Sequence, residues 1–272
     1  MRTYTLPAAV IAGALVLGVT ACGSDQTDGS DGGGKLVVGA TPTPAGEVLA
    51  YVQQNLAKKA GLDLEVKEFT DYVLPNTALQ QGELDANLYQ HTPYLEDFNK
   101  SRGTTLTPVT EVYLPPLGFY SEKVEDVTKL REGATVALPN DVTNEGRALG
   151  LLASQGVIGL KKGAGVNATP RDVADNPRKL KFKELEAAQL PRSLGDVDVA
   201  AVNNNFALDA GLSPQKDAIL LESVKDNPYN NVLAVKKGDE DDPRVKKLAE
   251  LLTSPEVKKF IEDTYKGAVL PA

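Results

Sequence analysis

The side chains best suited to chemistry in this sequence are aromatic rings and one imidazole. Tyr89, His91 and Tyr94 lie close together, and Tyr72 comes shortly before them. Tyr89, His91 and Tyr94 lie where a predicted strand ends and a predicted helix begins, and this end of a strand faces ligands in α/β proteins. The four rings could wall an apolar slot with polar tips, suited to a flat or polarisable side chain such as a thioether. The alternative is that they pack in the core, with the histidine buried and hydrogen-bonded.

A second candidate group surrounds Arg147, in a segment that starts with Pro139 and Asn140. The segment follows a predicted strand and opens a predicted helix, so it places Arg147 in the first helical turn. Free backbone N–H groups favour an anion there, and a guanidinium can add a bidentate contact to a carboxylate. A cation is otherwise unfavourable at a helix N-terminus, which favours a binding role. The alternative is an exposed arginine paired to Glu145 or Asp141.

Asparagines form a third group. Residues 203–205 end an apolar strand, and residues 229–231 precede another strand. A carboxamide can accept a hydrogen bond from an ammonium group and donate one to a carboxylate. The alternative for any single asparagine is turn chemistry.

The elements that must position these groups alternate between strands and helices. Such alternation predicts an α/β fold with mainly parallel sheets, in which ligands bind beyond the carboxyl ends of the strands. Hydrophobic spacing and Thr-Pro helix starts place the elements. The predicted strands are 36–40, 62–66, 84–88, 135–138, 181–185, 197–202, 219–221 and 232–235, and the predicted helices are 43–61, 92–102, 144–155, 243–252 and 255–265.

Composition excludes several classes of function. The 272 residues suit a bilobal body or one large domain, and 42% hydrophobic with 24% charged residues is a globular composition. The net charge of −8 comes without a Lys/Arg block, so no nucleic-acid face is expected. One cysteine and one histidine exclude an intrachain disulfide and a zinc site built from several such ligands. No G-x-S-x-G or P-loop motif is present, so a binding protein is favoured over an enzyme.

The N-terminus has the pattern of a bacterial export signal. An apolar run with one preceding arginine occupies residues 1–21 and is too short and too broken by Pro and Gly to span a bilayer. It ends in Val-Thr-Ala before Cys22, which resembles a lipobox and predicts a lipidated mature N-terminus. The alternative is an ordinary secretory signal with a free thiol. Gly, Ser and Asp dominate the following residues, so 22–34 is predicted to be a flexible tether.

Taken together, these motifs resemble the methionine-binding lipoproteins of the NlpA/MetQ type, which serve ABC importers. The resemblance is carried by FTDYVLPNTALQQGELDANLYQHTPYLEDF (69–98), VALPNDVTNEGRALGLL (136–152), LEAAQLPRSLGDVDVAAVNNNFA (185–207) and NPYNNVLAV (227–235). It implies a two-lobed type II periplasmic-binding-protein fold with a hinge and an interlobe ligand cleft. One lobe would comprise 35–116 and 226–272, and the other 117–225.

The resemblance also implies a role for each candidate. The ligand side chain would lie among the aromatic residues, the carboxylate would be held by the arginine, and asparagines would meet the amino-acid head. Two positions depart from the usual family pattern: Tyr89 stands where phenylalanine is common, and 204–206 replaces a Thr/Gly-containing run that ends in tyrosine. The residues that match the family's ligand-binding positions are Tyr72, Tyr89, His91, Tyr94, Asn144, Arg147, Asn203 and Asn231.

The sequence therefore predicts a lipid-anchored receptor on the extracytoplasmic face of the cell membrane. We expect a monomer that binds methionine, with the D-enantiomer left open, and delivers it to a permease with a cytoplasmic ATPase. No cofactor, metal or nucleic acid is expected. The alternatives are a same-fold receptor for a methionine-containing dipeptide or another amino acid, an extracytoplasmic enzyme that uses His91, and a structural or adhesive lipoprotein.

Overall fold

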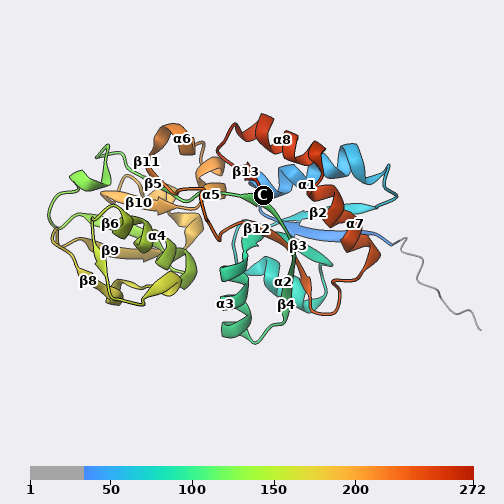
Figure 1. Cartoon of the computed structure of the whole chain (residues 1–272), viewed down its shortest axis with the longest axis horizontal. Coiled ribbons are helices and arrows are strands. Elements are labelled where there is room, and N and C mark those ends of the chain that lie inside the picture. The colour runs from blue at the N-terminus through green and yellow to red at the C-terminus, as the bar shows by residue number, and fades with distance from the viewer. Residues whose placement is uncertain (1–33) are drawn as a thin grey trace, which may run out of the picture. The chain divides into compact units, whose positions relative to one another are not determined.

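The computed structural model describes residues 34–272, and the predicted signal peptide, Cys22 and nearly all of the predicted tether lie outside the described residues. Residues 34–272 form two large β-sheets with helices packed on them, together with one small two-stranded sheet (Figure 1). The predicted α/β fold class is confirmed. Among the described residues, no helix combines the length and the apolar character that crossing a membrane requires.

The first sheet contains six strands from both ends of the described chain. β1 pairs in parallel with β2 and β3, whereas β12 runs antiparallel to β3 and β4, and β13 runs antiparallel to β4. In spatial order the strands are β13 (Leu270–Pro271), β4 (Leu106–Leu114), β12 (Asn231–Lys236), β3 (Ala86–His91), β1 (Leu36–Ala40) and β2 (Leu64–Glu68).

Helices cover both faces of this sheet. Alternate residues along β1 point to opposite faces, and they join different cores: Val38 packs with α1, α7 and α8, whereas Val37 packs with α2 and α3. Both cores are clusters of buried hydrophobic side chains, and their close packing holds the sheet between the two layers of helices. The helices are α1 (Glu47–Val52), α2 (Leu74–Gln81), α3 (Thr92–Arg102), α7 (Pro243–Leu252) and α8 (Pro255–Tyr265).

The second sheet contains five strands from the middle of the chain. Its parallel part is β10, β6 and β9, and β5 runs antiparallel to both β10 and β11. Leu149 and Leu152 of α4 (Val142–Ser154) pack on one face, and Phe206 of α5 (Asn204–Asp209) packs on the other. In spatial order the strands are β11 (Ala218–Leu221), β5 (Gly118–Tyr120), β10 (Val199–Val202), β6 (Thr135–Pro139) and β9 (Lys181–Leu185).

Minor elements complete the two halves. They are α6 (Pro214–Asp217), the two-stranded sheet of β7 (Gly159–Leu160) and β8 (Val173–Asp175), and seven short helical turns, η1 (Pro42–Gly46), η2 (Gln53–Ala57), η3 (Val127–Lys129), η4 (Gly165–Asn167), η5 (Pro170–Asp172), η6 (Ala187–Gln189) and η7 (Pro191–Ser193). The chain crosses from the first sheet to the second between β4 and β5, over residues 115–117. It returns between β11 and β12, over residues 222–230.

The expectation of mainly parallel sheets is wrong, because antiparallel pairs occur in both sheets. The cause lies in the two crossings. The returning chain enters the first sheet beside the end of β3, where Asn231 pairs with His91, so β12 must run opposite to β3. A parallel neighbour would need a connection that leads back to the start of the sheet. Strands β4 and β5, which flank the other crossing, were not predicted at all.

Candidate functional site

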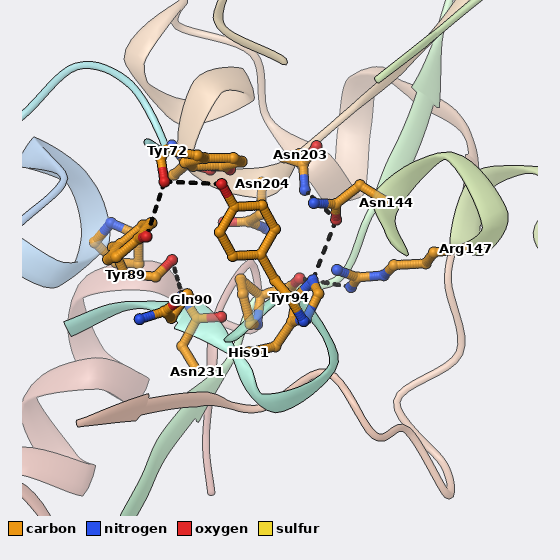
Figure 2. A pocket seen from close by; sticks show the side chains of 13 residues that line it. Tyr72, Tyr89, Gln90, His91, Tyr94, Asn144, Arg147, Asn203, Asn204 and Asn231 are labelled. Carbon is orange, nitrogen blue, oxygen red and sulfur yellow. Dashed lines mark hydrogen bonds between the residues drawn. The ribbon is translucent and has the colours of Figure 1, made fainter. Parts of the chain in front are cut away.

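All eight residues predicted to bind ligand line a single pocket (Figure 2). Both sheets contribute to the lining. Pro44, Gln90 and Pro115 also line it and were not predicted. Asn204 and Asn205 line it as well; they belong to the predicted asparagine group but were not among the eight residues.

Strand and helix ends place these side chains. Tyr89 and His91 are among the last residues of β3, Asn203 directly follows β10, and Asn231 is the first residue of β12, opposite His91. These positions are the carboxyl ends of parallel strands and the start of their antiparallel neighbour, so they meet at one edge. The prediction that the candidates follow strand ends is confirmed for β3 and β10.

Three tyrosines form one wall of the pocket. The hydroxyls of Tyr89 and Tyr94 both donate to the carbonyl oxygen of Tyr72, each at 2.8 Å. The Tyr72 ring lies 5.8 Å from each of the other two, and Phe206 approaches it from behind at 5.0 Å. Burial raises the pKa of Tyr72 and Tyr89, so both phenols stay neutral. Because the hydroxyls of Tyr89 and Tyr94 are occupied by this carbonyl, a ligand would contact the faces and edges of the rings.

His91 is buried and hydrogen-bonded, as predicted for aromatic residues that pack in the core, and it also lines the pocket. Its Nδ1 accepts from the backbone N–H of Tyr94 at 3.1 Å and so caps α3. Nε2 therefore carries the proton and donates to Oδ1 of Asn144 at 3.2 Å. Burial, and then the positive charge of Arg147, lower the pKa of His91 to about 3. His91 is a neutral, fixed donor at physiological pH.

A titration of the sole imidazole tests this assignment. In the native protein, the ¹⁵N shifts of labelled His91 should stay constant from pH 8 to pH 5, with titration only near pH 3, whereas urea-unfolded protein should titrate near its usual pKa of about 6.5. Between these values only the unfolded chain binds the proton, so stability falls as pH falls through this window. The slope from this group is about 1.4 kcal/mol per pH unit. A native midpoint between pH 5.5 and 7 would contradict the assignment.

Arg147 is buried, with its side chain only 2% exposed. Its Nε donates to Oε1 of Glu222 at 2.8 Å, and its Nη2 donates to Oε2 of Glu222 at 2.5 Å and to the Pro115 carbonyl at 3.1 Å. The Tyr229 ring stacks on the guanidinium at 4.1 Å. Among residues 34–272, Nη1 has no hydrogen-bond partner. The proposed alternative of an exposed arginine paired to Glu145 or Asp141 is wrong.

The predicted anion site at the start of α4 is also wrong in its detail. The helix begins at Val142, so Arg147 lies in the second turn instead of the first. The helix N-terminus already carries a carboxylate, because Oδ1 of Asp141 accepts from the backbone N–H of Asn144 at 2.9 Å. The Asn144 amide is engaged as well: Nδ2 donates to Asp141, and Oδ1 accepts from His91 and, at 2.8 Å, from Asn203. Asn144 thus ties the end of β3 to the second sheet.

Three polar atoms in this region are buried and have no partner within the part of the chain that the structure describes. They are Oδ1 of Asn203, Oδ1 of Asn204 and Nδ2 of Asn205. Buried polar groups in native proteins are nearly always hydrogen-bonded, so we expect these atoms to form hydrogen bonds to a bound molecule. Their residues line the same pocket as Arg147. Figure 2 shows the arginine at one side of this group and Tyr72 and Tyr89 at the other.

A buried carboxamide cluster supports the pocket from behind. Oδ1 of Asn76 accepts from Nδ2 of Asn87 at 2.8 Å and from Nε2 of Gln90 at 2.7 Å, and its Nδ2 donates back to Gln90 at 2.7 Å. All three side chains are buried. The sequence signal for this cluster is the pair of amides on β3, a strand whose residues are all buried. The cluster fixes Gln90 where it meets the pocket.

A second, more open hollow adjoins the pocket and shares Tyr72 and Tyr94 with it. Its other lining residues include the carboxylates of Asp71, Asp97 and Glu186. Within residues 34–272, no three His, Cys, Asp or Glu side chains are grouped so that they could hold a metal ion. The chemistry of the site is therefore that of hydrogen bonds, one guanidinium and aromatic surface.

The chain is similar to known proteins in both sequence and structure. The model of the NlpA lipoprotein family matches residues 36–272. The D-methionine-binding lipoprotein MetQ of Escherichia coli K12 is 41% identical over 263 residues (95% of each chain), and the methionine-binding lipoprotein MetQ of Bacillus subtilis is 43% identical over 260 residues (93% of each chain). A nutrient-binding protein from Burkholderia cenocepacia, solved bound to methionine, superimposes with a TM-score of 0.84 at 50% identity, covering 87% of this chain and 99% of that one. The protein belongs to the NlpA lipoprotein family.

Proposed function

We propose that this protein is an extracytoplasmic solute-binding receptor for methionine, which it delivers to an ABC importer. The observation that carries the proposal is the set of atoms that lack partners around one small pocket. The free Nη1 of Arg147 lies on one side and a wall of tyrosine rings lies on the other, and the unpartnered atoms belong to three consecutive asparagines that line the same pocket. The names of the relatives support the same ligand.

The polar side of the pocket matches the head of an α-amino acid. Nη1 of Arg147 can donate to the ligand carboxylate, and Nδ2 of Asn205 is a second free donor. Oδ1 of Asn203 and Oδ1 of Asn204 are free acceptors for an ammonium group. The side-chain oxygen of Asn231 adds a third acceptor, because its Nδ2 is occupied by Tyr89 and Tyr113. A zwitterion would satisfy all of these groups at once.

The apolar side matches a thioether. Tyr72, Tyr89 and Tyr94 present ring faces and edges while their hydroxyls are engaged elsewhere. Sulfur is favourable against aromatic rings, at about 0.3–1.5 kcal/mol per contact. His91 and Asn144 are hydrogen-bonded to each other where the polar and apolar sides of the pocket meet. We assign them the role of positioning the neighbouring side chains, in addition to any direct contact with the ligand.

We propose that the two sheets are the cores of two lobes, 35–116 with 226–272 and 117–225, which close around the ligand. Two contacts support this assignment, because each joins the sheets across the pocket. The Tyr72 hydroxyl donates to Oδ1 of Asn205 at 2.5 Å, and His91 donates to Asn144 at 3.2 Å. The crossings at 115–117 and 222–230 would form the hinge.

The remaining assignments follow from the same role. Cys22 would carry a lipid that holds the receptor at the extracytoplasmic face of the membrane, and the partner would be a permease with a cytoplasmic ATPase. The protein would act as a monomer, without a cofactor and without covalent chemistry. A dipeptide that contains methionine remains the second candidate ligand, because the adjoining hollow could receive an extension past Tyr72 and Tyr94.

Calorimetry on the full-length protein, after removal of co-purified ligand, tests the proposal. L-methionine should bind with a stoichiometry of one, and norleucine, which replaces the sulfur with a methylene, should bind more weakly. D-methionine and methionine dipeptides complete the panel and rank the candidate ligands. Absence of methionine binding in protein that melts cooperatively would reject the proposal.

A further inference from the structure

Glu222 is the only carboxylate that contacts Arg147 within residues 34–272, and no sequence pattern predicts this pair. It follows β11 at the start of the second crossing. Two hydrogen bonds join it to the guanidinium, and Oε2 also accepts from the backbone N–H of Leu117 at 3.2 Å. Its own backbone N–H donates to the Leu117 carbonyl at 2.9 Å. Glu222 is thereby fixed to both crossings and to the arginine.

The ion pair of Arg147 and Glu222 sets the net charge at the pocket. Arg147 is the only ionised side chain among the described residues that line it, since His91 is neutral. The side chains of Arg147 and Glu222 are 2% and 11% exposed, so solvent screens them little. Burial alone would raise the pKa of Glu222, but the Arg147 guanidinium outweighs it and holds that pKa below its usual range. Glu222 is therefore ionised and cancels the arginine charge.

Geometry leaves the arginine able to bind while its charge is cancelled. Glu222 occupies Nε and one N–H of Nη2, and Pro115 occupies the other, which leaves Nη1 for a ligand. A ligand carboxylate at Nη1 then meets a pair whose net charge is zero. A zwitterion adds no net charge to the buried site, whereas an anion would bring an uncompensated negative charge beside Glu222.

We propose that Glu222 sets the charge selectivity of the pocket: by neutralising Arg147 it admits net-neutral amino acids and rejects anionic analogues of the same shape. This inference rests on the proposed function, in which the ligand carboxylate meets Arg147. Glu222 acts through the arginine and is a positioning and selectivity residue. The carboxylate of Asp141 accepts a hydrogen bond from Asn144 instead of from Arg147, and every variant below retains it.

Three ligands of nearly equal shape test the proposal by calorimetry on the full-length protein. They are methionine, its α-hydroxy acid analogue, which is an anion, and methioninol, which is a cation. In Glu222→Gln the ratio of methionine affinity to hydroxy-acid affinity should fall at least about tenfold relative to the parent. The affinity for methioninol should fall as well, because the unpaired Arg147 charge repels a cation. Arg147→Gln should shift the preference in the opposite direction, toward methioninol.

Two controls separate this effect from simple loss of structure. Glu132→Gln removes the same charge from a carboxylate that is 65% exposed and that, within residues 34–272, is paired only to Lys179; it should leave all three affinities unchanged. The double variant Arg147→Gln/Glu222→Gln removes both charges of this pair and leaves neither one behind unpaired, so its ratio of methionine to hydroxy-acid affinity should return to within about threefold of the parent. If Glu222→Gln fails to fold, the comparison of Arg147→Gln with the double variant takes its place: removing the Glu222 charge should reverse the shift that Arg147→Gln causes, and equal ratios in these two variants would contradict the inference.

Two outcomes would overturn the inference. One is an equal change in all three affinities in Glu222→Gln, and the other is a tenfold shift of the ratio that persists in the double variant. Either result would leave the proposed function intact, because the parent protein would still bind methionine. A parent that binds none of the three ligands would instead reject the proposed function itself.

Discussion

Arg147→Ala should lower the affinity for methionine by at least about a hundredfold, which corresponds to about 3 kcal/mol. The variant loses the charge-assisted contact to the ligand carboxylate, typically about 1.5–3 kcal/mol. It also leaves Glu222 buried beside that carboxylate, so like charges then face each other. Calorimetric titration with methionine measures the loss. Unchanged affinity would contradict the role assigned to this arginine.

The same substitution should also destabilise the fold. Breaking a buried ion pair by removing one partner typically costs about 3–5 kcal/mol, because the remaining charge is left unpaired. Urea unfolding without ligand should show this loss for Arg147→Ala. The matched double variant Arg147→Ala/Glu222→Ala removes both charges and should recover most of the stability. Its methionine affinity should stay low, and full recovery of affinity would mean that the arginine acts only through folding.

Asn76→Ala should lower the free energy of unfolding by about 3 kcal/mol or more. Asn76 makes three hydrogen bonds with Asn87 and Gln90, and its removal leaves several buried amide groups without partners. Such orphaned groups cost more than the net value of the bonds themselves. Because Gln90 lines the pocket, methionine affinity should fall as well, by a smaller factor.

Asn55→Ala is the matched control for this prediction. Asn55 is exposed on a short helical turn and makes one local hydrogen bond to the Tyr51 carbonyl. Its loss should change the unfolding free energy by no more than about 0.5 kcal/mol. Equal effects of the two substitutions in urea unfolding would show that the carboxamide cluster does not stabilise the fold.

Local patterns in the sequence were enough to locate most of the pocket. The segment around Tyr89 and His91 reads as the end of a buried strand followed by a helix start, and that junction is where ligands bind in α/β proteins. The helix indeed starts at Thr92, although its cap is the imidazole of His91 and not the threonine. Side chains placed by one strand end and the next helix start are predictable, since both are local.

Contacts between distant segments were not predictable in the same way. Arg147 and Glu222 are 75 positions apart, and nothing near either residue shows that a crossing segment brings them together. Strand β4 was missed because Pro108 and alternating polar residues break its apolar pattern. Helix α2 was not predicted because a polar residue, Asn76, occupies one of its buried positions while Leu74 is exposed, so apolar spacing does not mark the helix. These features depend on pairing and packing in three dimensions.

A crystal structure of the protein with selenomethionine as ligand would test the central claim most directly. The anomalous signal of selenium locates the side-chain end independently of the rest of the ligand. The account predicts a selenium atom among the rings of Tyr72, Tyr89 and Tyr94, with the carboxylate hydrogen-bonded to Nη1 of Arg147 and the ammonium on the asparagine oxygens. A ligand with its carboxylate directed away from Arg147, or a selenium atom outside the tyrosine wall, would contradict it.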